Sequence, residues 1–319
     1  MFESLGFETL TAPQATIWFA LGLGVVFGAL AQVTRFCLRR ALVGEDRRQA
    51  AGVWLTALAV AVLGTQGAVA LGWIGFGDHR FMASELPVLA IVAGGLMFGA
   101  GMVLTRGCIS RLTVLSGSGN LRALLVLLVF AVTAHAALKG VLAPLRTSLG
   151  SVTLGLDSAA LPGSPLIWTA LIVIGALAVA LRSGNRPVML ALAALIGLLV
   201  PLAWVGTGYV LYDDFDPIAM ESLSFTSPAA ESMFYTVAAS AIPASFGTGL
   251  VGALAAALLS GSFAWQSFES PRQTGRYMAG AVLMGLGGVL AGGCTVGAGL
   301  SGVPTLSVAA VLAILSIVA

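Results

Sequence analysis

The sequence contains very little charge: charged residues make up only 9% of its 319 positions, whereas 58% are hydrophobic. A chain of this length with so few polar groups cannot cover a water-soluble domain. The mean hydropathy of +1.01 is instead typical of a protein surrounded by lipid. The net charge of +2 is too small to indicate a nucleic-acid partner, and no basic run with interleaved aromatic residues occurs.

Several chemical signatures are also missing. No G-x-x-x-x-G-K-[ST] run is present, and membrane spans leave no room for a nucleotide-binding domain, so ATP-driven pumping by this chain alone is not expected. The two histidines, His79 and His135, are too isolated to form a zinc site with the cysteines. Three cysteines cannot all pair with one another, which leaves at least one free thiol. We expect no metal and no cofactor.

Long apolar stretches dominate what is present. A helix needs roughly 20 apolar residues to cross the hydrocarbon core of a membrane. The sequence predicts an all-α polytopic membrane protein with nine transmembrane helices, at about 14–36, 50–73, 87–105, 121–143, 165–182, 187–209, 242–261, 276–293 and 304–319.

The basic residues are distributed unevenly between the two sides of these spans. If the N-terminus lies outside, twelve arginines face inward, namely Arg35, Arg39, Arg40, Arg47, Arg48, Arg106, Arg111, Arg122, Arg182, Arg186, Arg272 and Arg276. Only Arg80, Lys139 and Arg146 then face outward. Cytoplasmic loops are enriched in Lys and Arg, so we expect the N-terminus outside and the C-terminus inside.

Each of the three cysteines ends a similar glycine-rich apolar segment. The segments run from Phe27-Gly28 to Cys37, from Phe98-Gly99 to Cys108 and from Met284-Gly285 to Cys294. In all three, an apolar-Gly pair stands ten and nine residues before the thiol. Glycine in a membrane helix more often allows close packing than ligand contact, and a lone buried cysteine is usually a small hydrophobe. Three cysteines in three matched settings nevertheless favour a functional role.

The residues around two of the thiols predict short helices that fold back into the membrane. Ser116-Gly117-Ser118-Gly119-Asn120 follows Cys108 as a turn, with Asn120 as the expected N-cap of the next span. Around Cys294, glycines recur at 285, 287, 288, 292, 293, 297, 299 and 302. This density interrupts regular helix and lets the backbone approach a ligand closely. Such backbone is tolerated at membrane depth only where protein or a wet cavity satisfies it.

A weak internal repeat relates the two halves of the chain. Ile196-Gly197 precedes Gly206 by the spacing that separates Phe27-Gly28 from Cys37, which pairs span one with span six. An odd offset inverts the second copy, and inverted repeats are a common plan among transporters. We therefore expect a single membrane domain over residues 1–319. It would contain a first pseudo-repeat at about 14–143, a linking span at about 165–182 and a second pseudo-repeat at about 187–319.

Thiols beside backbone N–H groups at helix starts form a soft, electropositive environment. A small anion with a polarizable sulfur or selenium end suits it, because the thiols match the soft atom and the N–H groups match charged oxygens. Arg35, Arg106 and Arg111 would add positive potential, although their simplest role is as cytoplasmic anchors. No Asp or Glu is expected inside a span, which argues against a buried carboxylate proton relay.

Two motifs carry a resemblance to a known family. Thr105-Arg106-Gly107-Cys108 is followed by Ser116-Gly117-Ser118-Gly119-Asn120-Leu121, and Gly292-Gly293-Cys294-Thr295-Val296-Gly297 is followed by Gly299-Leu300-Ser301-Gly302. With the Cys37 segment, they resemble the YeeE/YedE family of sulfur-transport proteins. The resemblance implies a thiosulfate importer of the bacterial inner membrane, with a periplasmic N-terminus, a cytoplasmic C-terminus and short inward-pointing helices. It also implies a cytoplasmic sulfur-carrier partner of the TusA type.

On this resemblance the substrate-binding residues would be Cys37, Cys108, Cys294, Gly107, Gly292, Gly293, Thr295 and Gly297. The leading hypothesis is uptake of thiosulfate or a related small sulfur anion without a covalent step. The alternative is a membrane sulfurtransferase in which one cysteine carries the sulfur as a persulfide. A third possibility is a scaffold subunit whose cysteines only pack.

Overall fold

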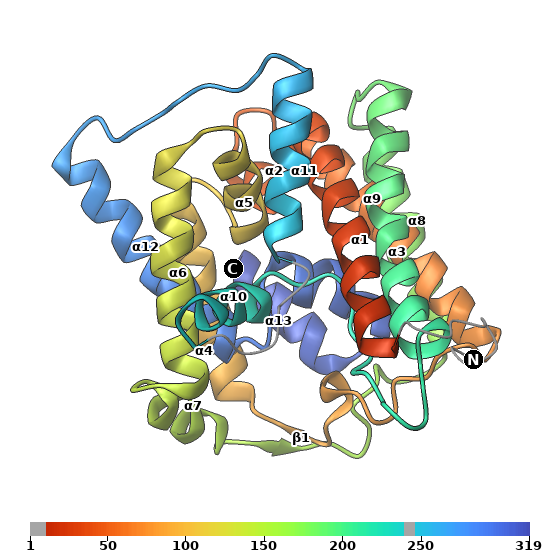
Figure 1. Ribbon diagram of the computed structural model, residues 1–319. Coiled ribbons are helices and arrows are strands. Elements are labelled where there is room, and N and C mark those ends of the chain that lie inside the picture. Colours follow the sequence, from red (N-terminus) through yellow and green to blue (C-terminus); the bar gives the residue numbers. More distant parts are fainter. Residues whose placement is uncertain (1–10, 239–245) are drawn as a thin grey trace.

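The computed structural model describes residues 11–238 and 246–319, which form a mainly helical bundle (Figure 1). Within these residues, six helical stretches are long and apolar enough to cross a membrane. They are Ala12–Val43, Arg47–Ala70, Val88–Gly117, Leu121–Lys139, Pro187–Val210 and Pro271–Thr305. The chain is therefore a multi-pass membrane protein, as its composition predicts.

Six long helices account for most of these stretches. They are α1 (Ala12–Thr34), α3 (Arg47–Ala70), α4 (Val88–Leu104), α6 (Leu121–Lys139), α9 (Pro187–Val205) and α12 (Pro271–Leu290). All six lie close to spans predicted from the sequence. Two begin with side-chain caps: Asn120 Oδ1 accepts a hydrogen bond from Ala123 N at 3.0 Å, and Ser270 Oγ accepts one from Gln273 N at 3.3 Å. The expected role of Asn120 as an N-cap is thus confirmed.

The other three predicted spans correspond to helices outside the six membrane-spanning stretches. These are α8 (Pro165–Leu181), α11 (Phe246–Leu259) and α13 (Val308–Val318). Residues 242–245 of the seventh predicted span lie outside the described residues. Helix α13 has 11 residues, a length of about 16 Å, whereas the hydrocarbon core is about 30 Å thick. The number of nine spans therefore stays a prediction.

Several short elements connect these helices. They are α2 (Leu38–Val43), η2 (Arg80–Met82), β1 (Glu85–Leu86), α5 (Ile109–Gly117), α7 (Ala143–Gly150), β2 (Leu154–Gly155), η3 (Gly206–Val210), α10 (Thr226–Ala238), η4 (Thr295–Gly302) and η5 (Val303–Thr305). Strands β1 and β2 pair antiparallel. In Figure 1 they lie with α7 at the bottom of the bundle, while the connection between α11 and α12 lies at the top.

Glycines allow the helices to pack closely. Helix α12 lies against α4 and α6. A Cβ atom added at Gly94 would come within 2.5 Å of the backbone nitrogen of Ala291, so no side chain fits there. The same holds for two glycines of the cysteine segments: added Cβ atoms would come within 2.4 Å of Ile317 O at Gly99 and within 2.8 Å of Thr133 Cβ at Gly285. These two glycines of the repeated pattern serve helix packing.

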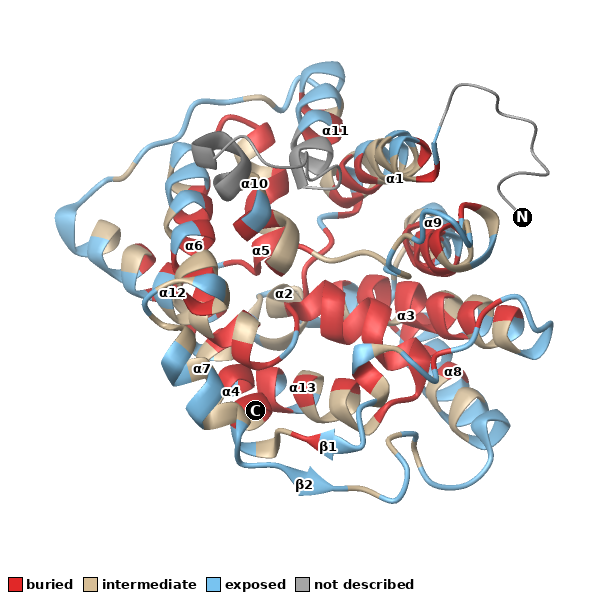
Figure 2. Ribbon diagram, turned by 60° about the horizontal axis from the view of Figure 1, so that its bottom comes forward, coloured by how far each residue is buried: buried red, intermediate tan, exposed pale blue. Residues whose placement is uncertain are grey.

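Buried residues gather toward the middle of the bundle (Figure 2). One buried cluster includes Phe27, Trp54 and Phe130 together with all three cysteines. Large apolar side chains point outward on the peripheral helices: Leu166 and Leu181 on α8 are 77% and 78% exposed. A helix bundle in a bilayer presents such side chains to lipid.

Candidate site at the three cysteines

The three cysteines lie deep in the bundle and form no disulfide. Cys37, Cys108 and Cys294 have exposed fractions of 5%, 1% and 0%. The thiols of Cys37 and Cys108 interact with each other, and the Thr295 hydroxyl lies beside the Cys108 sulfur. Cys294 immediately precedes Thr295 and lies within electrostatic range of Cys108. Residues that are 71 and 186 positions apart from Cys108 thus meet at one place.

The same backbone turn delivers each thiol. A long helix ends, and the residue two positions before each cysteine adopts a left-handed conformation: φ is 53° at Arg35, 59° at Arg106 and 74° at Gly292. The cysteine that follows is extended and becomes the N-cap of a short helix. These helices are α2 after Cys37, α5 after Cys108 and η4 after Cys294. The matched sequence spacing therefore corresponds to a matched structure.

The fourth copy of the pattern has a different structure. At Gly206, φ is −58°, and α9 continues directly into the π-helical segment η3 without a left-handed turn. No thiol stands at this position. The slot that lacks cysteine therefore also lacks the break that would direct a side chain into the centre.

Polar groups surround the sulfur atoms. The Sγ atom of Cys294 accepts a hydrogen bond from Gly297 N at 3.4 Å, and the backbone of Phe225 also interacts with it. The Sγ atom of Cys108 lies 3.3 Å from Ser110 Oγ. The backbone N–H groups of Arg40 and Arg111 face Cys37 and Cys108 in the same way, although no cap hydrogen bond closes in α2 or α5.

The four predicted site glycines differ in whether their surroundings leave space for a Cβ atom and whether their backbone needs a positive φ. An added Cβ at Gly293 would lie 2.8 Å from Ala298 N, and one at Gly297 would lie 3.0 Å from Ser224 Oγ. Gly292 is exposed and needs its positive φ. Gly107 has neither constraint, because its nearest neighbour would be the Leu112 side chain at 3.4 Å.

The three predicted arginines occupy different positions. Arg35 and Arg106 are exposed at the left-handed turns. Arg106 also lines a cavity of about 370 Å³ together with Arg272 and Arg276. Only Arg111 lies beside the thiols, on the first turn of α5 and within electrostatic range of Cys37 and Cys108.

A second cavity lies near Cys294, because its lining includes Phe225, whose backbone interacts with that thiol. It measures about 410 Å³ and lies between α1, η3 and α10, with Glu221 and Glu231 in its wall. Its lining includes Phe27 and Phe225, whose ring centroids are 5.2 Å apart. Phe27 also packs edge-on against Phe36, the residue before Cys37, at 6.2 Å. Aromatic rings thus stand next to both the cavity and the thiols.

Sequence reasoning missed several of these residues. Ser110, Ser224 and Phe225 touch the thiol region, and no motif marked them. Phe27 could have been found, because it forms the apolar half of the first apolar-Gly pair. Phe225 comes from the connection before α10, whose position in space depends on long-range packing that local sequence does not reveal.

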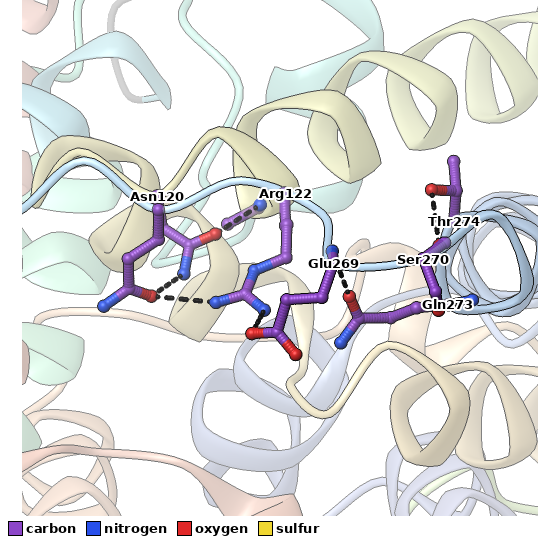
Figure 3. Close-up of polar contacts among 8 residues, drawn as sticks. Asn120, Arg122, Glu269, Ser270, Gln273 and Thr274 are labelled. Carbon is purple, nitrogen blue, oxygen red and sulfur yellow. Dashed lines mark hydrogen bonds and ion pairs between the residues drawn. The ribbon is translucent and has the colours of Figure 1, made fainter.

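The end of α5 away from Cys108 is held by the segment that links α11 to α12, residues 260–270. Asn120 Nδ2 donates to Gln266 Oε1 at 2.7 Å, and Arg122 reaches both Gln266 Oε1 at 3.2 Å and Glu269 Oε1 at 3.5 Å (Figure 3). Backbone hydrogen bonds join the same segment to Ser118 and Gly119. The short helix that carries Cys108 is therefore tied to the start of α12.

The chemistry available at the thiols is that of soft contact and hydrogen bonding. In the described part of the chain, the groups that interact most strongly with the three sulfurs are hydroxyls, backbone amides and the other thiols, and the Arg111 side chain lies within electrostatic range of Cys37 and Cys108. No cluster of three His, Cys, Asp or Glu side chains suited to a metal occurs within residues 11–238 and 246–319. The arrangement fits a soft anion better than a metal ion.

Comparison with known proteins gives a consistent picture. The family model described as Sulphur transport matches residues 33–319. The chain is 26% identical to a protein of Spirochaeta thermophila named thiosulfate transporter TsuA, over 93% of this chain and 94% of that protein. It is also 26% identical to the thiosulfate transporter TsuA of Escherichia coli K12, over 87% of this chain and 84% of that protein.

Proposed function

This chain belongs to the Sulphur transport family, and we propose from that membership that it carries thiosulfate, or a closely related sulfur anion, across the membrane. The observation that carries the proposal is the meeting of Cys37, Cys108 and Cys294 at one buried place. Relatives that share about a quarter of the sequence are named as thiosulfate transporters, which supports the choice of anion.

In this mechanism the terminal sulfur of the anion moves from thiol to thiol by weak S–H···S contacts. The cysteines are buried in the bundle, so the anion exchanges water for soft, polarizable neighbours. The N-termini of α5 and η4 offer backbone N–H groups to the charged oxygens. Thr295, Gly107, Gly292, Gly293 and Gly297 would form the remaining walls. The close packing at Gly293 and Gly297 would keep the start of η4 near the passing anion.

The transport requires no covalent intermediate. A sulfurtransferase would need a group that activates a thiol and another that protonates a leaving group. The groups that interact most strongly with the three sulfurs are hydroxyls, backbone amides and the other thiols, and none of these is an imidazole or a carboxylate. The residues in contact with the thiols therefore favour a transporter over the enzyme.

The direction and setting are part of the same proposal. The protein would lie in a bacterial inner membrane with its N-terminus in the periplasm, its C-terminus in the cytoplasm and its two halves as inverted repeats. The cavity lined by Phe27 and Phe225 would then open to the periplasm, and the arginine-rich end would face the cytoplasm. A TusA-like sulfur-carrier protein would be the partner on that side.

Uptake of radiolabelled thiosulfate into proteoliposomes tests this function. Cys108→Ala and Cys294→Ala should each reduce uptake more than about tenfold, the loss expected when a transition state loses a contact worth about 1.4 kcal/mol. Ser118→Ala is the matched control, because it removes a buried polar atom at the far end of α5 and should stay near wild type. Undiminished uptake by both cysteine variants at equal reconstitution would refute the cysteine path.

A further inference from the structure

Arg111 is a half-buried cation, and one donor of its guanidinium is buried and unused. Its Nη1 atom is shielded from solvent and has no hydrogen-bond partner among the described residues. A buried guanidinium normally satisfies its donors, because an unpaired buried donor costs about 1–3 kcal/mol and more when it is charged. The unused donor belongs to the arginine that lies beside Cys37 and Cys108.

The charged groups near Arg111 do not neutralise it. The nearby charged side chains are Arg35 and Arg40, which carry the same sign. Asp46, which follows this cluster in the sequence, already forms an ion pair with Arg40. Asp46, Glu221 and Glu269 form ion pairs with other arginines and not with Arg111. The site therefore has an excess of positive charge.

We propose that Arg111 binds the oxygen atoms of the transported anion while the terminal sulfur of that anion lies between Cys37 and Cys108. This inference rests on the proposed function and identifies the residue that binds the charged end of the substrate. Thiosulfate has one soft terminal sulfur and three oxygens on its central sulfur. A planar guanidinium donates to two such oxygens at once, which an ammonium group cannot do. The thiols and Arg111 together recognise tetrahedral sulfur oxyanions that carry a terminal chalcogen.

Other arginines near the site do not meet the same conditions. Arg35 and Arg106 are exposed, so water satisfies their side chains. Arg122 already pairs with Glu269. Arg39 also has a buried Nε atom without a partner, but it is not among the groups that interact with the thiols. Of these arginines in the described structure, Arg111 alone combines an unused buried donor with electrostatic proximity to the thiols.

The test compares two anions that differ at the charged end. Thiosulfate is a dianion with three oxygens, whereas methanethiosulfonate keeps the terminal sulfur but has two oxygens and one negative charge. Both are offered to proteoliposomes that contain wild-type protein, Arg111→Gln, Arg111→Lys or the exposed control Arg48→Gln. The KM for each anion, its maximal rate and the ratio of the two KM values are measured.

Arg111→Gln should raise the KM for thiosulfate about 10- to 100-fold, the range expected for a lost hydrogen bond to a charged group. The factor by which this variant raises the KM for methanethiosulfonate should be at least about fivefold smaller, so the preference for the dianion falls. Arg111→Lys keeps the charge without the planar donor pair and should lie between Arg111→Gln and wild type. Arg48→Gln should match wild type.

An unchanged KM for thiosulfate in Arg111→Gln would overturn the inference, and so would an equal rise for both anions, because a merely structural role affects both alike. If Arg111→Gln does not fold, Arg111→Lys replaces it in the test. A KM for thiosulfate equal to that of wild type in Arg111→Lys would then overturn the assignment. Wild-type protein that transports neither anion would contradict the proposed function itself. Failure of the inference alone leaves wild-type thiosulfate uptake intact, so the two failures are distinguishable.

Discussion

At the scale of single residues, identical backbone settings hold three thiols with different neighbours. Cys108 interacts with Cys37, Ser110 and Thr295, whereas Cys294 interacts mainly with backbone amides. Cys108 is thus the member of the set that joins the other two segments. We expect an anion that moves along the thiols to contact Cys108 whichever end it enters from.

Part of this site could be predicted from single residues and part could not. The spacing of Cys37, Cys108 and Cys294 predicted matched surroundings, because the same sequence pattern produces the same turn. The left-handed conformation of Arg35 and Arg106 could not be predicted, because a Cβ atom disfavours it by about 1–2 kcal/mol and glycine is the usual choice. Gly292 was the one position where the residue type itself indicated such a turn.

His79 is a residue with a second, independent consequence. It lies in the connection between α3 and α4, where its Nδ1 atom accepts a hydrogen bond from Phe81 N at 3.2 Å and its ring packs edge-on against Trp204 at 5.1 Å. The indole of Trp204 in turn donates to Ser301 O on η4 at 3.3 Å. Burial, followed by the nearby charge of Arg80, lowers the pKa of His79 to about 4.

The lowered pKa of His79 predicts a specific loss of stability in acid. The unfolded chain protonates this residue near pH 6.5, so the neutral ring adds stability that is complete above about pH 6.5 and is lost as the pH falls toward 4. His79→Asn keeps an acceptor for Phe81 N but cannot be protonated. Between pH 7 and 4.5, the melting temperature of purified protein should fall less in His79→Asn than in wild type. Equal falls in both proteins would show that His79 does not contribute.

At the scale of elements, the start of η4 depends on close backbone contact. Gly293 stands between the left-handed turn and Cys294, and a methyl group there would lie 2.8 Å from Ala298 N. Since Ala298 belongs to η4 itself, the clash can be relieved only by moving the helix start. Gly107 stands at the same place before Cys108, yet a methyl group there would meet only the Leu112 side chain at 3.4 Å.

These two glycines predict opposite outcomes for the same substitution. Gly293→Ala should destabilise the protein by about 1–3 kcal/mol, the usual cost of overpacking, and should reduce thiosulfate uptake because it moves Cys294. Gly107→Ala should change stability by less than about 1 kcal/mol and leave the melting temperature near that of wild type. The melting temperatures of the two variants are compared by heating each protein and measuring the remaining folded fraction by size-exclusion chromatography. Equal destabilisation by both variants would contradict this account of η4.

The length of the apolar stretches predicted the long helices well and the short ones poorly. Apolar stretches near the length of a membrane span located α1, α3, α4, α6, α9 and α12, because lipid requires such lengths. Helices α2, α5 and η4 have 6, 9 and 8 residues, too few for a periodic pattern. The glycines and cysteines around two of them indicated a break in the helix, while the way the broken ends meet depends on packing between distant segments.

At the scale of the whole molecule, charge separates toward the two ends of the bundle. Asn185 Nδ2 donates to Gln49 O at 2.9 Å, Arg122 pairs with Glu269, and Arg106 shares a cavity with Arg272 and Arg276. These contacts bring the loops of the twelve arginines to one end (Figure 1). Arg80 and Arg146 line a different cavity, next to β1 and α7. The sequence count of twelve against three thus has a spatial counterpart, although which end faces the cytoplasm stays a prediction.

Two matched serine-to-cysteine variants determine that orientation. Ser267 lies in the exposed connection between α11 and α12 at the arginine-rich end, and Ser158 lies in an exposed connection near the opposite end. The native thiols are at most 5% exposed, so the wild-type protein serves as the unlabelled control. Because positive charge is retained in the cytoplasm, a membrane-impermeant maleimide should label Ser158→Cys in intact cells and Ser267→Cys only after permeabilisation. The reverse pattern would place the N-terminus in the cytoplasm. The cavity lined by Phe27 and Phe225 would then face the cytoplasm, which would contradict uptake through it.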